Sequence, residues 1–386
     1  MNLDKIVKEK QMYDDIEYHN KYIGVFQTAI DYVKHQDVLM YGGLAVNEYM
    51  PMKYKIYDAN VLPDVDVFCM DPERLAKNVV EYLKNKGYNQ ATSYARALHT
   101  GTYAVYSSGH KVLDISLISP EDMRSLKRGG SKGMLGIPCV SPLFLRLTFH
   151  VLLATSSVER WAKMHERMLS FYKVFPPENA KLGDITMKLP TDKAVINDSI
   201  HYYLEKRSEA DDTVLIGTPI VNLMIEKDID EFKNLPFSIA LVQDNCKTYA
   251  ETMVTALADT VPGLRISEVH PNNELIFLPE HVIVSQGSKT VAIIFQADLK
   301  CFNYIKYKGV CVGTIHTVLM LYLAMTLSSE SCFVKMKPTI KVIADALTDM
   351  LLHSKSRSKV MKPLSLSCMG VKTGIATLRR QRFAKS

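Results

Sequence analysis

Carboxylates lie inside two segments of the chain that otherwise have the composition of buried strands. Asp64 and Asp66 are two residues apart in LPDVDVF, so an extended strand directs both side chains to the same face. Asp114 lies in the middle of KVLDISLI. A buried carboxylate is costly unless it is paired or binds a metal. Taken singly, an Asp-x-Asp is most often a solvated turn and Asp114 could be a local cap, but together they predict neighbouring strands that share a cation.

A pair of glycines precedes the first of these segments. Gly42 and Gly43 separate the strand-like VLMY from the helix-like LAVNEYM. Bare backbone and a helix N-terminus can approach a phosphate closely, although a Gly-Gly pair before a helix is common by chance. A strand, two glycines, a helix, Asp-x-Asp and a later strand with Asp is a rarer combination. It predicts a nucleotide site with oxygen ligands suited to Mg²⁺.

Helix-like and strand-like segments alternate along most of the chain, which indicates an α/β (α+β) fold. The first 37 residues have helical periodicity, and Ser141-Pro142 opens a helical stretch to about residue 175. From about residue 183 strand candidates return. We therefore predict a catalytic domain with an N-terminal helix at residues 1–135 and a helical connector at 136–182. A second α/β domain follows at 183–330, and a basic tail at 331–386.

The second half repeats part of the acidic pattern. Gly217 is followed by Asp228 and Asp230, and Asp298 lies near the end of the strand-like TVAIIFQADL. Because IEKDIDEFKN is dense in charge and poor in apolar residues, Asp228 and Asp230 do not resemble residues of a buried strand. We call these three aspartates the acidic echo, and we interpret them as part of a degenerate second copy of the fold rather than a second active site.

Charge and cysteine content narrow the function classes further. The net charge is +6, and the segment from His353 to Ser386 contains nine Lys and Arg and no acid, which suggests a polyanionic partner. Seven cysteines without a CxxC pair argue against a disulfide framework and a zinc knuckle, and favour a reducing, cytosolic compartment. The apolar stretch from Val310 to Leu327 contains His316 and is predicted to be a buried core helix rather than a membrane span.

Several motifs are similar to those of a known family. YGGLAVNEYMP (41–51), Tyr57-Asp58 and LPDVDVF (62–68) resemble the catalytic signature of the viral poly(A) polymerase catalytic subunits of poxviruses, giant viruses and other large DNA viruses. These belong to the polymerase-β-like nucleotidyltransferase superfamily. Further similar segments are VSPLF (140–144), Arg160-Trp161, Ile315-His316-Thr317 and CMG (368–370) with RRQR (379–382).

The resemblance implies roles for individual residues. Asp64, Asp66 and Asp114 match the metal-binding catalytic triad, and Gly42 and Gly43 match the triphosphate loop. Gly43 stands where many superfamily members have Ser. Asn47 would contact phosphate or ribose, or be an ordinary exposed helix residue. Independently of the resemblance, the basic tail predicts RNA contacts at Arg379, Arg380 and Arg382, because a packed basic strip beside the cleft suits a single-stranded RNA path.

The function implied is template-independent polyadenylation of RNA 3′ ends, with AMP transferred from ATP and two Mg²⁺ or Mn²⁺ ions. The partners implied are a single-stranded RNA 3′ end, ATP, and either a second copy of the chain or a cap-methyltransferase-like processivity subunit. No association with a membrane is expected. The family also implies a second, non-catalytic nucleotidyltransferase-like domain and work in the host cytoplasm or viral factory, with packaging in the virion left open. Two alternatives remain: a terminal transferase of other base or acceptor specificity, and a non-catalytic RNA-binding scaffold.

Overall fold

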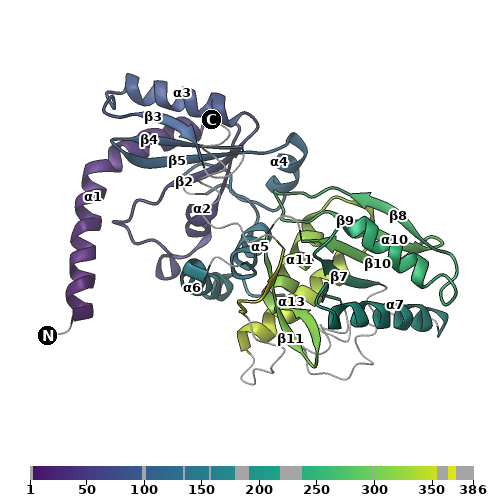
Figure 1. Ribbon diagram of the computed structural model, residues 1–386. Helices are drawn as coiled ribbons and strands as arrows, with labels where there is room; N and C mark the ends of the chain where they lie inside the picture. The colour runs from purple at the N-terminus through teal and green to yellow at the C-terminus, as the bar shows by residue number, and fades with distance from the viewer. Residues whose placement is uncertain are drawn as a thin grey trace. The chain divides into compact units, whose positions relative to one another are not determined.

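The computed structural model describes residues 3–97, 101–133, 135–155, 158–178, 191–217, 237–297, 300–353 and 364–370. These residues divide into two units, and the division falls after Leu145, within helix α5 (Pro142–Leu153). Each unit contains its own sheet and is described by itself (Figure 1). The mixed α and β architecture predicted from the sequence is confirmed.

The first unit is built on a five-stranded sheet in the order β1-β2-β5-β4-β3. Strands β2 and β5 are parallel, and the other neighbours are antiparallel. The strands are β1 (Leu39–Tyr41), β2 (Val65–Cys69), β3 (Ser93–Arg96), β4 (Thr102–Ser107) and β5 (His110–Leu117). The parallel pair brings together the two segments in which the sequence placed the carboxylates.

Four helices and a short 3₁₀ turn accompany this sheet. They are α1 (Leu3–Val33), α2 (Gly42–Tyr49), the 3₁₀ turn Met52–Tyr54, α3 (Pro72–Asn85) and α4 (Pro120–Lys127). In α3, Leu75, Val79 and Leu83 recur at helical spacing, and all three are buried against the sheet. Asp71 caps this helix, with its side chain accepting a hydrogen bond from the Arg74 backbone at 3.2 Å. The crossover from β2 to the parallel β5 runs through α3, β3 and β4.

The second unit contains an eight-stranded sheet in the order β13-β11-β12-β6-β7-β10-β9-β8. Its strands are β6 (Thr213–Leu215), β7 (Ser238–Val242), β8 (Leu264–His270), β9 (His281–Gln286), β10 (Lys289–Gln296), β11 (Phe302–Tyr307), β12 (Val310–Gly313) and β13 (Cys368–Met369). Its helices are α6 (Val158–Val174), α7 (Thr191–Glu209), α10 (Cys246–Ala256), α11 (Ile315–Leu327), α12 (Ser331–Val334) and α13 (Lys337–His353), together with most of α5.

Five strands of the second sheet repeat the first sheet. The order β6-β7-β10-β9-β8 matches β1-β2-β5-β4-β3, with an antiparallel, a parallel and two further antiparallel pairs in the same sequence. Helix α10 follows β7 as α3 follows β2. The two units therefore share a topology, and β11 to β13 are additions to the second.

Two helix predictions need correction. The helical stretch expected from Ser141 to about residue 175 is two helices, α5 and α6. Between them, Ala154 accepts a hydrogen bond from the Asn303 backbone at 2.8 Å and Thr155 bridges to Phe302, so pairing with β11 ends the helix. The stretch from Val310 to Leu327 is strand β12 followed by α11 rather than one helix.

The predicted burial of that stretch is confirmed. Every residue of α11 from Ile315 to Met325 is buried. Among the described residues, no helix combines the length and apolar composition needed to cross a membrane.

The cysteine prediction also needs correction, because Cys301 and Cys368 form a disulfide. The two residues are 67 positions apart, and strand β13 brings them together by pairing with β11. An odd cysteine count and the absence of CxxC spacing carry no information about such a pairing.

Candidate active site

The three predicted carboxylates meet at the parallel pair of strands in the first sheet. Asp66 on β2 pairs in register with Asp114 on β5, and Asp64 precedes β2 by one residue. Each of the three offers a carboxylate oxygen, and these oxygens lie within 4.8 Å of one another. The period-2 geometry of β2 and its parallel partner thus produces the cluster that the sequence predicts.

A lysine that the sequence analysis did not single out joins this cluster. The ammonium group of Lys111 lies 2.5 Å from one oxygen of Asp64 and 2.5 Å from one oxygen of Asp114. Burial lowers the pKa of Lys111, but the hydrogen bonds to Asp114 and Asp64 outweigh burial, so its pKa is raised overall. Lys111 is therefore a cation between the two carboxylates.

Strand irregularity explains why Lys111 escapes sequence reasoning. Lys111 and Asp114 are three residues apart, which places them on opposite faces of a regular strand. The pairing of β4 with β5 shifts between Val105 and Tyr106, whose partners are Leu113 and Lys111. The extra residue on β5 is a β-bulge, and it turns Lys111 to the face of the carboxylates.

The single positive charge of Lys111 does not balance the three carboxylates of the cluster. Burial, followed by the charges of Asp64 and Asp114, raises the pKa of Asp66 well above its ordinary value, although Lys111 opposes this. One oxygen of Asp114, Oδ1, is buried without a hydrogen-bond partner among the described residues. Three oxygen donors with excess negative charge and an orphaned acceptor fit a hard divalent cation such as Mg²⁺.

The two glycines of the predicted phosphate loop lie beside these carboxylates. Gly42 begins helix α2 with φ of +73°, and a Cβ at this position would come within 2.2 Å of the Asp66 carboxylate. A Cβ at Gly43 would come within 2.2 Å of the Tyr57 hydroxyl. Close approach and a positive φ both favour glycine at position 42, whereas a side chain at position 43 would have to displace the Tyr57 ring.

Asn47 anchors a loop in this structure. Its side chain is buried, and its Oδ1 accepts hydrogen bonds from the backbone of Ile56 at 3.0 Å and Tyr57 at 3.2 Å. The interpretation of Asn47 as an exposed helix residue is wrong, and its contact with nucleotide stays a prediction. By holding residues 56 and 57, Asn47 sets the position of Tyr57 next to Gly43.

The motif residues after Asn47 fasten helix α2 to the segment that precedes α5. Glu48 accepts a hydrogen bond from the Leu135 backbone at 2.9 Å. The Tyr49 hydroxyl donates to the carbonyl of Val140 at 2.9 Å and accepts from the backbone of Ser131 at 3.0 Å. The hydrogen bonds of Glu48 and Tyr49 therefore hold helix α2, which starts at the phosphate loop, against this segment.

A partly buried network of hydroxyl groups surrounds the residue before the loop. The Tyr41 hydroxyl lies 2.8 Å from Ser116 Oγ, which lies 2.8 Å from Thr102 Oγ1, and the Tyr41 ring stacks on Phe68 at 3.9 Å. Burial and the nearby Asp66 carboxylate raise the pKa of Tyr41, so its phenol stays protonated. This network fixes the residue that immediately precedes Gly42.

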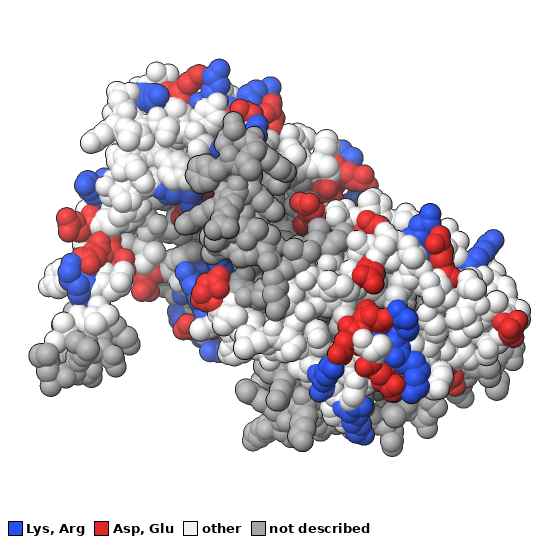
Figure 2. Space-filling view, in the orientation of Figure 1, with Lys and Arg blue, Asp and Glu red and all other residues white. Residues whose placement is uncertain are grey.

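The other predicted site residues lie outside the described part of the chain. These are Asp228, Asp230 and Asp298 of the acidic echo and Arg379, Arg380 and Arg382 of the basic tail. On the face drawn in Figure 2, the described Lys and Arg residues alternate with Asp and Glu in small groups, without a broad area of one sign.

Comparison with known proteins agrees with this site. Residues 27–157 match the model of a family described as the poly(A) polymerase catalytic subunit. A crystal structure described as the Megavirus polyadenylate synthase is similar to the chain, with a TM-score of 0.80 and 18% identity over 100% of this chain and 81% of that chain. A comparison with curated protein sequences gives no match.

The family match confirms the resemblance seen in the sequence. The matched residues 27–157 include all three carboxylates, both loop glycines and Lys111. The structural likeness extends the nucleotidyltransferase fold to the whole chain. Within residues 27–157 the chain is similar to poly(A) polymerase catalytic subunits, the class of enzyme that the sequence predicts.

Proposed function

We propose that this chain, whose residues 27–157 match the catalytic domain of poly(A) polymerases, transfers AMP from ATP to the 3′-hydroxyl of single-stranded RNA without a template and releases pyrophosphate. The observation that supports this most directly is the parallel pairing of Asp66 with Asp114, with Asp64 beside them. A non-catalytic scaffold gains nothing from keeping three acids together, because they repel one another.

Asp64, Asp66 and Asp114 would hold the Mg²⁺ or Mn²⁺ ions of the proposed reaction. Bound there, divalent ions would activate the attacking hydroxyl and neutralise charge on the leaving pyrophosphate. When no metal ion is bound, the ammonium group of Lys111 pairs with the carboxylates of Asp64 and Asp114. Lys111 therefore keeps two of the carboxylates positioned before an ion arrives.

The phosphate loop would receive the triphosphate of ATP. Helix α2 starts at Gly42, so its first backbone N–H groups have no partner within the helix and can bind a phosphate. The absence of a side chain at Gly42 keeps the path to Asp66 open. At Gly43, the Tyr57 hydroxyl occupies the place that a side chain would take, and we assign Tyr57 the hydroxyl contact made elsewhere by Ser.

Extension of a labelled RNA by the purified chain tests the proposal. Each of the four NTPs is supplied in turn with Mg²⁺ or Mn²⁺, and ATP is expected to give the longest products. Asp66→Asn is expected to lower the extension rate by about 10³-fold, because ligation of the metal contributes several kcal/mol to transition-state stabilisation. The exposed acid Glu81 on α3 provides the matched control, and Glu81→Gln should be silent.

Other outcomes point to the alternatives. Preference for another nucleotide would favour a terminal transferase of different specificity. Binding of RNA without extension by the folded wild type would favour the scaffold. Sedimentation of the chain alone and with a cap-methylating protein would decide between a homodimer and a processivity partner.

A further inference from the structure

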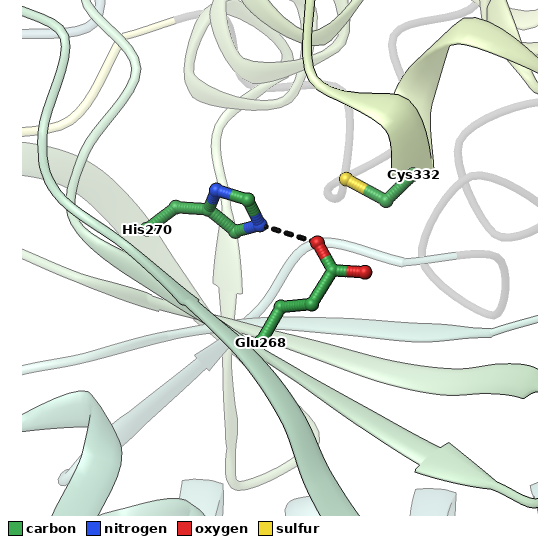
Figure 3. A group of neighbouring side chains, drawn as sticks. All are labelled: Glu268, His270 and Cys332. Carbon is green, nitrogen blue, oxygen red and sulfur yellow. Dashed lines mark hydrogen bonds and ion pairs between the residues drawn. The ribbon is translucent and has the colours of Figure 1, made fainter.

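The second unit contains a group of metal-binding side chains that is separate from the carboxylate cluster. His270 ends strand β8 and pairs in register with His281, which begins strand β9. Glu330 precedes the short helix α12, and Cys332 lies within it. Glu268, two residues before His270 on β8, completes the group (Figure 3).

In each of the two imidazole rings of this group, one nitrogen is held by a hydrogen-bond acceptor and the other faces Glu330. His281 is fully buried, and its Nδ1 lies 2.9 Å from the carbonyl oxygen of Pro279. This carbonyl can only accept, so Nδ1 carries the hydrogen. The Nε2 of His281 then lies 2.8 Å from an oxygen of Glu330.

His270 follows the same arrangement. Its Nε2 lies 2.8 Å from an oxygen of Glu268 (Figure 3), and its Nδ1 lies 3.7 Å from the same oxygen of Glu330 that contacts His281. The two rings stack with their centroids 4.9 Å apart. Each histidine thus has one nitrogen held by an acceptor and the other directed at Glu330.

This is the arrangement of histidines that bind metals. A metal-bound imidazole donates its second N–H to a carbonyl or carboxylate, which fixes the tautomer and leaves the other nitrogen for the ion. When both imidazoles are neutral and no ion is bound, their second nitrogens and the Glu330 oxygen are three acceptors facing one another. A cation between them satisfies all three.

Cys332 is placed to supply a fourth ligand. Its sulfur lies 3.9 Å from the shared Glu330 oxygen. Figure 3 shows that the Cys332 side chain points toward His270 and Glu268. Ligand atoms around a tetrahedral Zn²⁺ are about 3.3–3.8 Å apart, given the usual zinc–ligand distances. Ligand atoms of His270, His281 and Glu330 lie within 4.8 Å of one another, and so do those of Glu268, His270 and Cys332. Rotation of the Cys332 side chain would complete a tetrahedral set.

We propose that His270, His281, Glu330 and Cys332 bind one Zn²⁺ ion, with Glu268 and the Pro279 carbonyl holding the two histidines. Nitrogen and sulfur donors select Zn²⁺ over Mg²⁺, in contrast to the all-oxygen cluster of the first unit. The ion would join strands β8 and β9 to helix α12 and would be structural. The proposal does not depend on the proposed polymerase activity.

Binding of Zn²⁺ and Co²⁺ alone to the chelator-stripped full chain tests this proposal. We expect one tight equivalent of Zn²⁺ by calorimetry, and a cobalt form with the intense visible bands of tetrahedral coordination and a thiolate-to-cobalt charge-transfer band. Cys332→Ser should remove the charge-transfer band, and Glu268→Gln should weaken Zn²⁺ binding about 10- to 100-fold. Cys69→Ser, a partly buried free cysteine of the first unit, should change neither.

An Asp66→Asn background separates this site from the carboxylate cluster. The cobalt spectrum should persist in that background and disappear in the partly exposed His270→Ala variant, provided circular dichroism shows that the variant is folded. A folded wild type without a tight equivalent of Zn²⁺ would overturn the proposal. So would a tight equivalent that survives both His270→Ala and Cys332→Ser, because the ion would then be held elsewhere.

Discussion

The two sheets of this protein share a strand order but place opposite kinds of side chain at the same positions. In the first sheet, Tyr41 pairs with Asp66, Asp66 pairs with Asp114, and a glycine follows Tyr41. In the second sheet, Ile216 hydrogen-bonds to Ile239, Ile239 pairs with Ile293, and Gly217 follows Ile216. The glycine is retained, and the paired aspartates are replaced by paired isoleucines.

The replacement extends to the third acid. Phe237 precedes Ile239 by two residues, as Asp64 precedes Asp66, and Phe237, Ile239 and Ile293 are all at most 2% exposed. Strands β7 and β10 carry no acid at any position. The second copy therefore has an apolar core where the first has a cluster of three carboxylates. This supports the prediction that the second unit is non-catalytic, with the acidic echo at Asp228, Asp230 and Asp298 still untested.

The largest effect should follow from placing an acid in the second sheet. Ile239→Asp should destabilise the chain by about 3 kcal/mol or more, because it removes a buried side chain and buries a carboxylate without a partner. Denaturant unfolding measures the loss, and Ile239→Val should cost only about 1 kcal/mol. A stable Ile239→Asp variant would mean that this position is not part of a closed apolar core.

The glycine before each helix offers a second comparison. Gly42→Ala should lower the extension rate by about 10²-fold at an unchanged fold, because the methyl group collides with the Asp66 carboxylate and the backbone has positive φ. At Gly217 a Cβ would instead meet the Ile239 backbone nitrogen at 2.7 Å. Gly217→Ala should therefore reduce stability, with activity lost only in proportion to unfolding. Equal losses of specific activity in the two folded variants would contradict the comparison.

Binding of Mg²⁺ at the carboxylates of the first sheet should raise the melting temperature of the protein. Without the ion, burial and then the charges of Asp64 and Asp114 raise the pKa of Asp66, and a bound cation opposes this. Saturating Mg²⁺ should raise the melting temperature of the wild type by a few degrees, since ligand at about 100 times its Kd stabilises by about 2.7 kcal/mol. Asp66→Asn should melt higher than the wild type in EDTA and respond less to Mg²⁺. Equal responses would place the Mg²⁺ site outside this cluster.

The smallest effect is expected at Tyr57. If its hydroxyl contacts the triphosphate, Tyr57→Phe should raise the KM for ATP by about 2- to 10-fold, the value of one hydrogen bond. The effect on kcat should be small, and an unchanged KM would remove the hydroxyl from the phosphate site. The segment that follows Gly217 in the second unit lies outside the described residues, so this variant refines the comparison rather than testing it.

The sequence predicts the carboxylate cluster well because regular strand geometry determines it. The alternation in DVDVF (64–68) aims Asp64 and Asp66 together, and a single parallel pairing adds Asp114. Lys111 is different, because its direction depends on a bulge that only the pairing with β4 reveals. The role of Asn47 also depends on tertiary structure, since its partners are the backbone groups of a loop.

Fold features that depend on distant partners were likewise not predictable. The break between α5 and α6 arises where Thr155 pairs with Phe302, and local helical periodicity contains no sign of this. The Cys301–Cys368 disulfide depends on strand β13 pairing with β11. The repeat of the sheet was visible only as a glycine followed by acids. The structure shows that strand order is repeated while the acids of β2 and β5 have no counterparts on β7 and β10.

The crossover between β2 and β5 has a consequence for the kinetics of folding. Asp66 and Asp114 become neighbours only after α3, β3 and β4 have been placed between them, so the ion site depends on contacts between residues far apart in the chain. Interactions that form after the folding transition state slow unfolding without accelerating folding. A bound divalent ion should therefore lengthen the lifetime of the folded first unit while leaving its rate of formation almost unchanged.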